Sequence, residues 1–82
     1  MIILDGSRMT GREELHAHLK EKLGLPDYYG GNLDALNDCL GERRERELIV
    51  ISGAGEFVRG CGNYGLKLLQ VFNDNGIQVL LD

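Results

Sequence analysis

The chain has 82 residues, of which 43% are hydrophobic and 27% are charged, and its formal net charge is -4. This composition is typical of one soluble folded domain, because disordered chains have too little apolar surface to bury. The acidic balance argues against nucleic acid as a direct ligand, since phosphate binding depends on Lys and Arg. No apolar run approaches the roughly eighteen residues that a membrane helix needs. We therefore expect a single domain over residues 1–82 and no membrane partner.

The start of the chain and its two cysteines bear on the cellular compartment. After Met1 the chain reaches an acid, Asp5, following three apolar side chains, and it lacks the basic segment of a signal peptide. Cys39 and Cys61 could pair in principle, but without a secretory signal a reduced, cytoplasmic setting is favoured. Cys39 adjoins a stripe of leucines, so we interpret it as a thiol that packs against the core.

The first quarter of the chain predicts a strand followed by a helix. Residues 2–4 form a short apolar run that ends in a turn at Asp5-Gly6, as a buried strand does. Thr10 to Glu13 has the spacing of a capping box at a helix start. Leucines then recur every fourth residue until Gly24, which predicts the end of the helix.

A second helix is predicted after a break at Pro26, because the residue before a proline is disfavoured in a helix. Residues 27–31 are expected to form a loop, and Asn32 can cap the following helix through its side chain. Gly41 is expected to end this helix. Its apolar stripe consists of Leu33, Leu36 and Leu40.

The second half of the chain predicts a strand, a helix and a final strand. Residues 48–51 are continuously apolar, as in strands buried on both faces. A glycine-rich loop is expected over residues 53–65, with room for one helical turn at residues 56–59. A helix ending at residues 73–76 and a strand over residues 77–81 follow. This order of elements predicts an α/β fold with a small parallel sheet and helical crossovers.

The excess negative charge comes from one segment. Between Lys22 and Arg43 there is no basic residue, but there are four acidic ones: Asp27, Asp34, Asp38 and Glu42. Asp34 and Asp38 stand at i and i+4, where like charges cost a few tenths of a kcal/mol, and Asp38 also lies toward the negative end of the helix dipole. A solvated polar face is the plain alternative. We favour a binding face for a cationic partner. Charges that destabilise a helix without a compensating contact often mark functional sites.

Other chemical readings of the sequence are weaker. The paired carboxylates lack the further oxygen ligands and spacing of a hard-cation site. His16 and His18 point in different directions on a helix, so we expect surface histidines rather than a metal site. The glycine-rich segment fails as a nucleotide loop, because Val58 replaces the third glycine of one pattern and Cys61 the lysine of the other. We expect no catalytic residue, no metal and no cofactor.

The run from Leu25 to Leu40 resembles the signature of the barstar family, the intracellular inhibitors of barnase-type ribonucleases. It contains a proline, Tyr-Tyr-Gly, Asn-Leu-Asp-Ala-Leu and Asp-Cys-Leu without a gap. Weaker similarity extends through Leu15-His16 and through residues 69–72. The resemblance implies a three-stranded parallel β-sheet packed with three to four helices.

The resemblance also implies a partner-binding surface on the second helix and the loop before it. In the family, the aspartate that matches Asp38 replaces an RNA phosphate in the nuclease site, and the one matching Asp34 adds charge. Tyr28 matches a tyrosine that packs on the nuclease, and Asp74 matches a glutamate that forms a peripheral ion pair. The residues expected to contact the partner are Tyr28, Asn32, Asp34, Asn37, Asp38, Gly41 and Asp74.

The expected function is inhibition of a basic, barnase-type ribonuclease by a non-enzymatic, cytoplasmic protein, which we expect to be a monomer. An alternative is an immunity or binding protein of the same fold for a different basic toxin. The chain departs from the family at Asn37, where tryptophan is common, and in the loop of residues 41–46. Arg43 and Arg44 in that loop are expected to place positive charge at the rim of the binding surface and to disfavour some partners.

Overall fold

A computed structural model describes residues 1–43 and 46–82. Its sheet contains β1 (Ile2–Asp5), β2 (Ile49–Ser52) and β3 (Val79–Leu81), all parallel and in the order β1-β2-β3. The three-stranded parallel sheet expected from the sequence is therefore confirmed.

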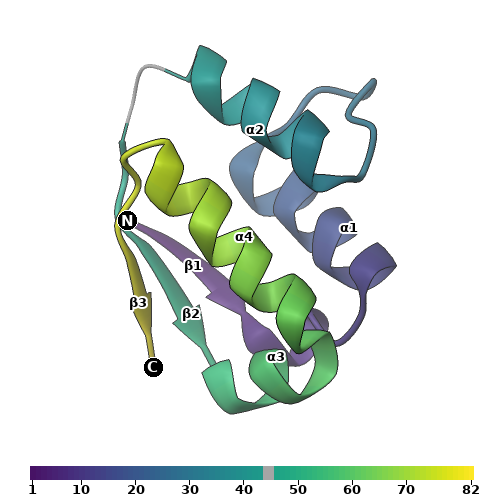
Figure 1. Cartoon of the computed structure of the whole chain (residues 1–82), viewed down its shortest axis with the longest axis vertical. Coiled ribbons are helices and arrows are strands. Elements are labelled where there is room, and N and C mark those ends of the chain that lie inside the picture. The colour runs from purple at the N-terminus through teal and green to yellow at the C-terminus, as the bar shows by residue number, and fades with distance from the viewer. Residues whose placement is uncertain (44–45) are drawn as a thin grey trace.

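The helices lie together on one side of this sheet (Figure 1). A short 3-10 turn (Gly6–Arg8), α1 (Arg12–Leu23) and α2 (Leu33–Glu42) connect β1 to β2, while α3 (Ala54–Cys61) and α4 (Asn63–Asp74) connect β2 to β3. Both connections step across the sheet in the same direction. Because such crossovers are almost always right-handed, they carry their helices to the same face.

The strands are consequently buried on one face only, and the prediction that β2 is buried on both faces is wrong. Ile49 and Ile51 point into the core, whereas Val50 between them is half-buried. Val50 pairs with Ile3 on one side and Leu80 on the other. Ile3 and Leu80 are 52% and 48% exposed. A continuous apolar strand therefore did not indicate a second covering layer.

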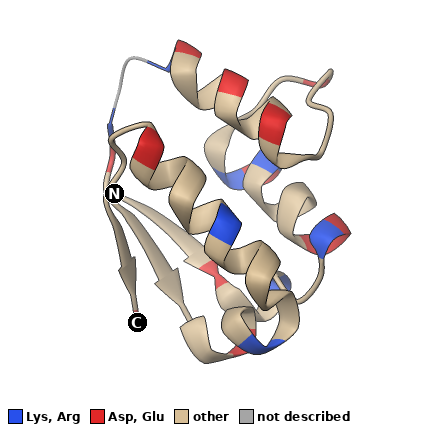
Figure 2. Cartoon of the chain, viewed as in Figure 1, with Lys and Arg blue, Asp and Glu red and all other residues tan. Residues whose placement is uncertain are grey.

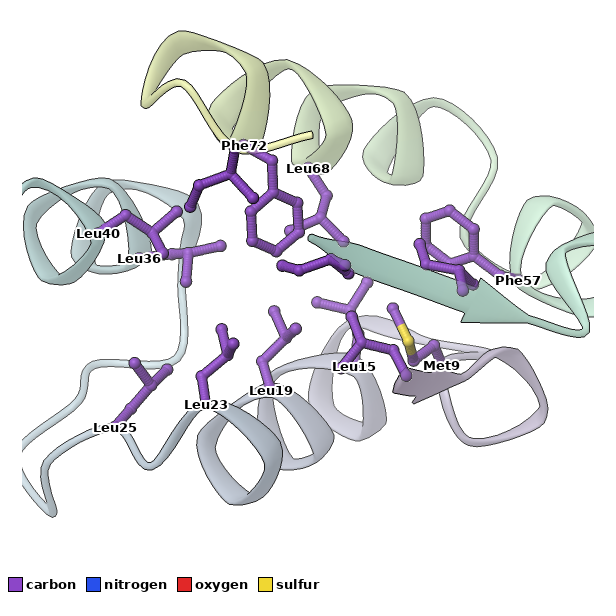
Figure 3. Packing of buried hydrophobic residues seen from close by; sticks show 14 residues of the cluster. Met9, Leu15, Leu19, Leu23, Leu25, Leu36, Leu40, Phe57, Leu68 and Phe72 are labelled. Carbon is purple, nitrogen blue, oxygen red and sulfur yellow. The ribbon is translucent and has the colours of Figure 1, made fainter. Parts of the chain in front are cut away.

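The core forms where α1, α2 and α4 meet the inner face of the sheet, as Figure 3 shows. Leucines of α1, spaced four residues apart, face Leu36 and Leu40 of α2 and Phe72 of α4. Burial of each such side chain stabilises the fold by about 1.5–3 kcal/mol before the loss of chain entropy is counted. Fixing α2 by its leucines also fixes which of its side chains face solvent.

The segment of residues 53–65 is helical, and the expected glycine-rich loop is a wrong prediction. It forms α3 and the first turn of α4, with Phe57 of α3 buried in the core. Its glycines permit close packing: a Cβ at Gly60 would lie 2.5 Å from the Cα of Thr10. Gly60 therefore marks a close contact between segments, whereas Gly53 and Gly62, with φ of 71° and 54°, supply the positive-φ backbone at the two ends of α3.

The limits of α1 agree with the sequence at one end only. Gly24 ends the helix with left-handed backbone, as predicted. At the start, however, the N-cap is Gly11, which offers no side-chain hydrogen bond, so the predicted capping box of Thr10 and Glu13 does not form. Gly11 has extended backbone and helical geometry begins only at Arg12, so Thr10 is one residue too early to cap.

Candidate functional site

The side chain of Asn32 begins α2 and thereby orients its acidic side. Asn32 Oδ1 accepts a hydrogen bond of 2.8 Å from the backbone N–H of Ala35, which confirms the predicted cap. Leu36 and Leu40 are fully buried. Asp34 and Asp38 are exposed, as expected for positions on the other side of an amphipathic helix. The helix ends at Glu42, one residue after the predicted Gly41.

The negative charge of α2 is not neutralised by the described part of the chain. Figure 2 shows its acidic positions along the side turned away from the sheet. Asp34, Asp38 and Glu42 form no ion pair with a cation among residues 1–43 and 46–82. Asp27, in the preceding loop, has Lys20 Nζ at 4.0 Å from its carboxylate. We name these four carboxylates the acidic face; three of them have no internal counter-charge within the described residues.

Tyr28 projects from the loop beside the acidic face, with 82% of its surface exposed. The loop is held by a backbone hydrogen bond of 2.9 Å from Tyr29 N–H to the Pro26 carbonyl. A shallow cavity of about 230 Å³ lies between this loop and α2, and a second of about 290 Å³ lies on the side of Pro26. The first is lined by Tyr28, Tyr29, Gly30, Ala35, Asp38, Cys39 and Glu42. The Tyr28 ring and the Asp38 carboxylate thus line the same cavity.

His16 is buried behind this loop, so its prediction as a surface histidine is wrong. Only 4% of His16 is exposed. Its Nδ1 lies 2.5 Å from Tyr29 Oη, and its Nε2 lies 2.6 Å from Tyr64 Oη. Burial lowers the pKa of His16 and raises the pKa of both tyrosines, so all three groups are neutral at pH 7. The leucine spacing of α1 predicts that Leu15, the neighbour of His16, lies in the core. It does not reveal the two tyrosine hydroxyls that contact His16, because they come from distant segments.

His18 is also buried, with 1% exposed, and binds β1. The backbone N–H of Asp5 donates a hydrogen bond of 2.9 Å to His18 Nε2, which must therefore be unprotonated. Burial lowers the pKa of this imidazole, and Arg8 and Lys22 lower it further. Its Nδ1 has no hydrogen-bond partner in the described part of the chain. His18 therefore joins α1 to β1 and is not part of the acidic face.

The C-terminal end of α4 lies against the middle of α2. Asn75 Nδ2 donates hydrogen bonds of 2.8 Å to Asn37 Oδ1 and 2.9 Å to the Val71 carbonyl. A Cβ at Gly41 would lie 4.0 Å from Asn75 Oδ1. Asp74, exposed and hydrogen-bonded by Gln70, is the residue next to Asn75. The fold therefore brings Asn37, Gly41 and the end of α4 together, although about 35 residues separate them in the sequence.

Arg43 keeps its positive charge but is anchored to the end of α1, and its predicted effect on partner choice stays a prediction. Its guanidinium donates a hydrogen bond of 2.7 Å to the Leu23 carbonyl at the end of α1, and its side chain is half-buried. The last carbonyls of a helix lack internal donors, so this contact satisfies one of them. The matching prediction for Arg44 lies outside the described residues.

The cysteines and acidic residues show no sign of a catalytic or metal centre within residues 1–43 and 46–82. Both cysteines are free. Burial raises the pKa of the Cys39 thiol, and Glu42 and Asp38 raise it further, which opposes formation of the reactive thiolate. No cluster of three His, Cys, Asp or Glu with metal-binding geometry occurs in the described part. No helix there is long and apolar enough to cross a membrane.

Comparisons with known proteins match this chain to a family model and to a curated relative. A family model described as "Barstar (barnase inhibitor)" matches residues 1–79. A protein of Bacillus subtilis (strain 168) named "Putative ribonuclease inhibitor YrdF" is 42% identical over 74 residues, which cover 89% of this chain and 81% of that protein. The family match and the relative both span nearly the whole fold, including the acidic face.

Proposed function

The chain belongs to the barstar family, and from this premise we propose that it is a protein inhibitor that binds the active site of a ribonuclease. The observation that carries the proposal is the acidic face, where three exposed carboxylates of α2 have no cation partner within the described residues. A basic partner can therefore bind these carboxylates without breaking an ion pair among the described residues.

The proposed mechanism is occupation of a cationic cleft by carboxylates that act as phosphate mimics. A ribonuclease cleft binds RNA phosphates through Arg, Lys and His side chains. Asp38 lines the shallow cavity beside Tyr28, so a cationic side chain entering there would meet a carboxylate and an aromatic ring together. Tyr28 would add apolar contact area, and Asp34 and Asp74 would add charge around it. Asn32, Asn37 and Gly41 complete the proposed contact surface.

The proposed inhibitor carries out no chemistry itself. It needs only a preformed surface, and the Asn32 cap, the buried leucines of α2 and the Asn37–Asn75 hydrogen bond supply the rigidity. A rigid surface binds with less loss of conformational entropy than a mobile one. We propose a cytoplasmic monomer that forms a one-to-one complex with a barnase-type enzyme.

The test is a titration of barnase with this protein during RNA cleavage. We expect inhibition that saturates at equimolar protein and that is competitive with RNA, because the carboxylates occupy the phosphate sites. Glu56→Gln, which removes an exposed charge from α3 at the far end of the fold, is the matched control and should inhibit as well as wild type.

Lack of inhibition of barnase and of a panel of basic ribonucleases would refute the proposed function. Binding to a basic toxin without nuclease activity would instead support an immunity protein of the same fold. Inhibition that RNA does not relieve would contradict the phosphate-mimic mechanism while leaving an inhibitor role in place.

A further inference from the structure

A partly buried chain of polar side chains links the start of α4 to the loop beside the acidic face. It consists of Tyr64 on α4, His16 on α1 and Tyr29 in the loop. Both ring nitrogens of His16 lie within 2.6 Å of a tyrosine oxygen. A neutral imidazole has one N–H donor and one acceptor nitrogen, so it satisfies both contacts only by donating to one hydroxyl and accepting from the other.

One tautomer extends this chain to Asn32, the N-cap of α2. Tyr29 Oη lies 3.5 Å from the Asn32 carbonyl oxygen and can donate to it. Tyr64 O–H then donates to His16 Nε2, and His16 Nδ1–H donates to Tyr29 Oη. The same Asn32 carbonyl accepts the first helical hydrogen bond of α2, from Leu36 N–H, at 3.0 Å. Short polar contacts therefore run from α4 to Tyr29, and a longer, weaker one reaches the cap of α2.

The Tyr29 hydroxyl joins the loop to His16, so a shift of the imidazole would act on the loop through that contact. Gly31 has a φ of +68°, and a Cβ built there would lie 4.0 Å from His16 Cβ. On the other side, the Arg12 guanidinium lies 4.4 Å from the centre of the Tyr64 ring and holds that ring in place. The imidazole is thus fixed between the loop and α4.

Resting on the proposed function, we propose that Tyr64 is a positioning residue for partner binding. Through His16 it holds Tyr29, and with it the loop of residues 27–32 that carries Tyr28 and Asn32. Tyr64 itself is not among the expected contact residues, and nothing in the sequence pattern of α4 distinguishes it. Its hydroxyl acts by keeping the loop in one conformation before the partner arrives, which lowers the entropy lost on binding.

The first test removes only the hydroxyl, by Tyr64→Phe, and measures amide hydrogen exchange without any partner. We expect exchange at Tyr29 N–H and Ala35 N–H, which bind Pro26 and Asn32, to accelerate by about three- to tenfold, the effect of losing one hydrogen bond. Ile51→Val is the control: it loses a buried methyl group in β2 and should leave these two amides at the wild-type rate.

The second test measures barnase dissociation from the same variants. Tyr64→Phe should accelerate dissociation by about three- to tenfold, whereas Ile51→Val should have no effect. In a Tyr29→Phe background, Tyr64→Phe should have little further effect, because the chain to the loop is already broken. That loss of additivity separates positioning through Tyr29 from a general loss of stability.

Unchanged exchange at both amides in Tyr64→Phe would overturn the proposal. So would faster exchange with unchanged barnase dissociation, or equal effects of Tyr64→Phe in the wild-type and Tyr29→Phe backgrounds. If the wild-type protein fails to bind barnase, the proposed function fails for that enzyme, and the exchange measurement alone decides whether Tyr64 holds the loop.

Discussion

The helices α1 and α2 arrange their charges in opposite ways. In α1, Glu13 and Glu14 stand in the first turn and Lys20 and Lys22 in the last, which favours the helix dipole at both ends. In α2, the last turn has no basic residue and ends in Glu42. Both helices bury leucines in the same core, so packing does not explain the difference.

The comparison supports our proposal that α2 is arranged for binding, whereas α1 is arranged for stability. The buried histidines of α1 form hydrogen bonds to β1, to the loop and to α4, whereas the exposed carboxylates of α2 have no described cation partner. A helix with a row of like charges that lack counter-ions is stabilised by contacts with neighbouring elements. His16 of α1 holds the loop before α2, and Asn75 at the end of α4 binds Asn37 of α2.

The largest expected effect is on binding, from Asp38→Ala. Inhibition of barnase should weaken by about 2–4 kcal/mol, roughly thirtyfold or more, because Asp38 lines the cavity beside Tyr28 and is expected to be a central contact. The free energy of unfolding should stay the same or rise slightly, since the lost charge opposed the dipole. Urea unfolding and a titration of inhibition measure the two quantities. An unfolded variant, or full inhibition, would contradict the assignment.

Association with the partner should depend strongly on salt. Raising the salt concentration from about 0.01 to 1 M reduces the screening length from roughly 30 to 3 Å, so steering by the acidic face should largely disappear. We expect association with barnase to slow by about tenfold or more and dissociation to change less. Stopped-flow mixing measures both rates. An association rate that does not change with salt would remove steering from the account of α2.

Acid should destabilise the protein through the buried histidines of α1. His16 and His18 have pKa values lowered by burial, so below about pH 6.5 the unfolded chain binds more protons than the folded one. The free energy of unfolding should therefore fall as the pH drops through about 6.5, until the histidines of the folded state are protonated too.

The size of this effect should be about 1–3 kcal/mol, because protonated His18 can no longer accept from Asp5 N–H. His18→Gln retains an acceptor at that position but does not titrate, so its stability should change less between pH 7.5 and 5. Urea unfolding at both pH values measures the difference. Identical pH dependence in wild type and variant would show that His18 is not a source of the effect.

The smallest expected effect comes from exchanging the charges in the last turns of α1 and α2. Glu42→Lys should stabilise the protein by about 0.3–1 kcal/mol, by placing a cation at the end of α2 and opposite Asp38 at i, i+4. Lys22→Glu in α1 should destabilise it by a similar amount. Thermal unfolding detects both. Glu42→Lys should also slow association with barnase, and a variant that is neither more stable nor slower to associate would contradict the contrast between the helices.

The sequence determined the elements whose signals are local. Asn32 caps α2, Gly24 ends α1 and the leucine stripe of α2 faces the core, because each depends on residues within a few positions along the chain. The acidic row on α2 follows from the same helical spacing. The order of strands and helices was enough to predict a parallel sheet, since parallel strands need crossovers.

Only the tertiary structure decided features that join distant segments. The partners of His16 are 13 and 48 residues away, so periodicity alone could not distinguish a surface imidazole from a buried one between two hydroxyls. Arg43 binds the Leu23 carbonyl, and Phe57 draws residues 54–61 into a helix against the core. The open face of the sheet follows from two crossovers on the same side. In each case the deciding contact lies in three dimensions, where local propensity carries no information.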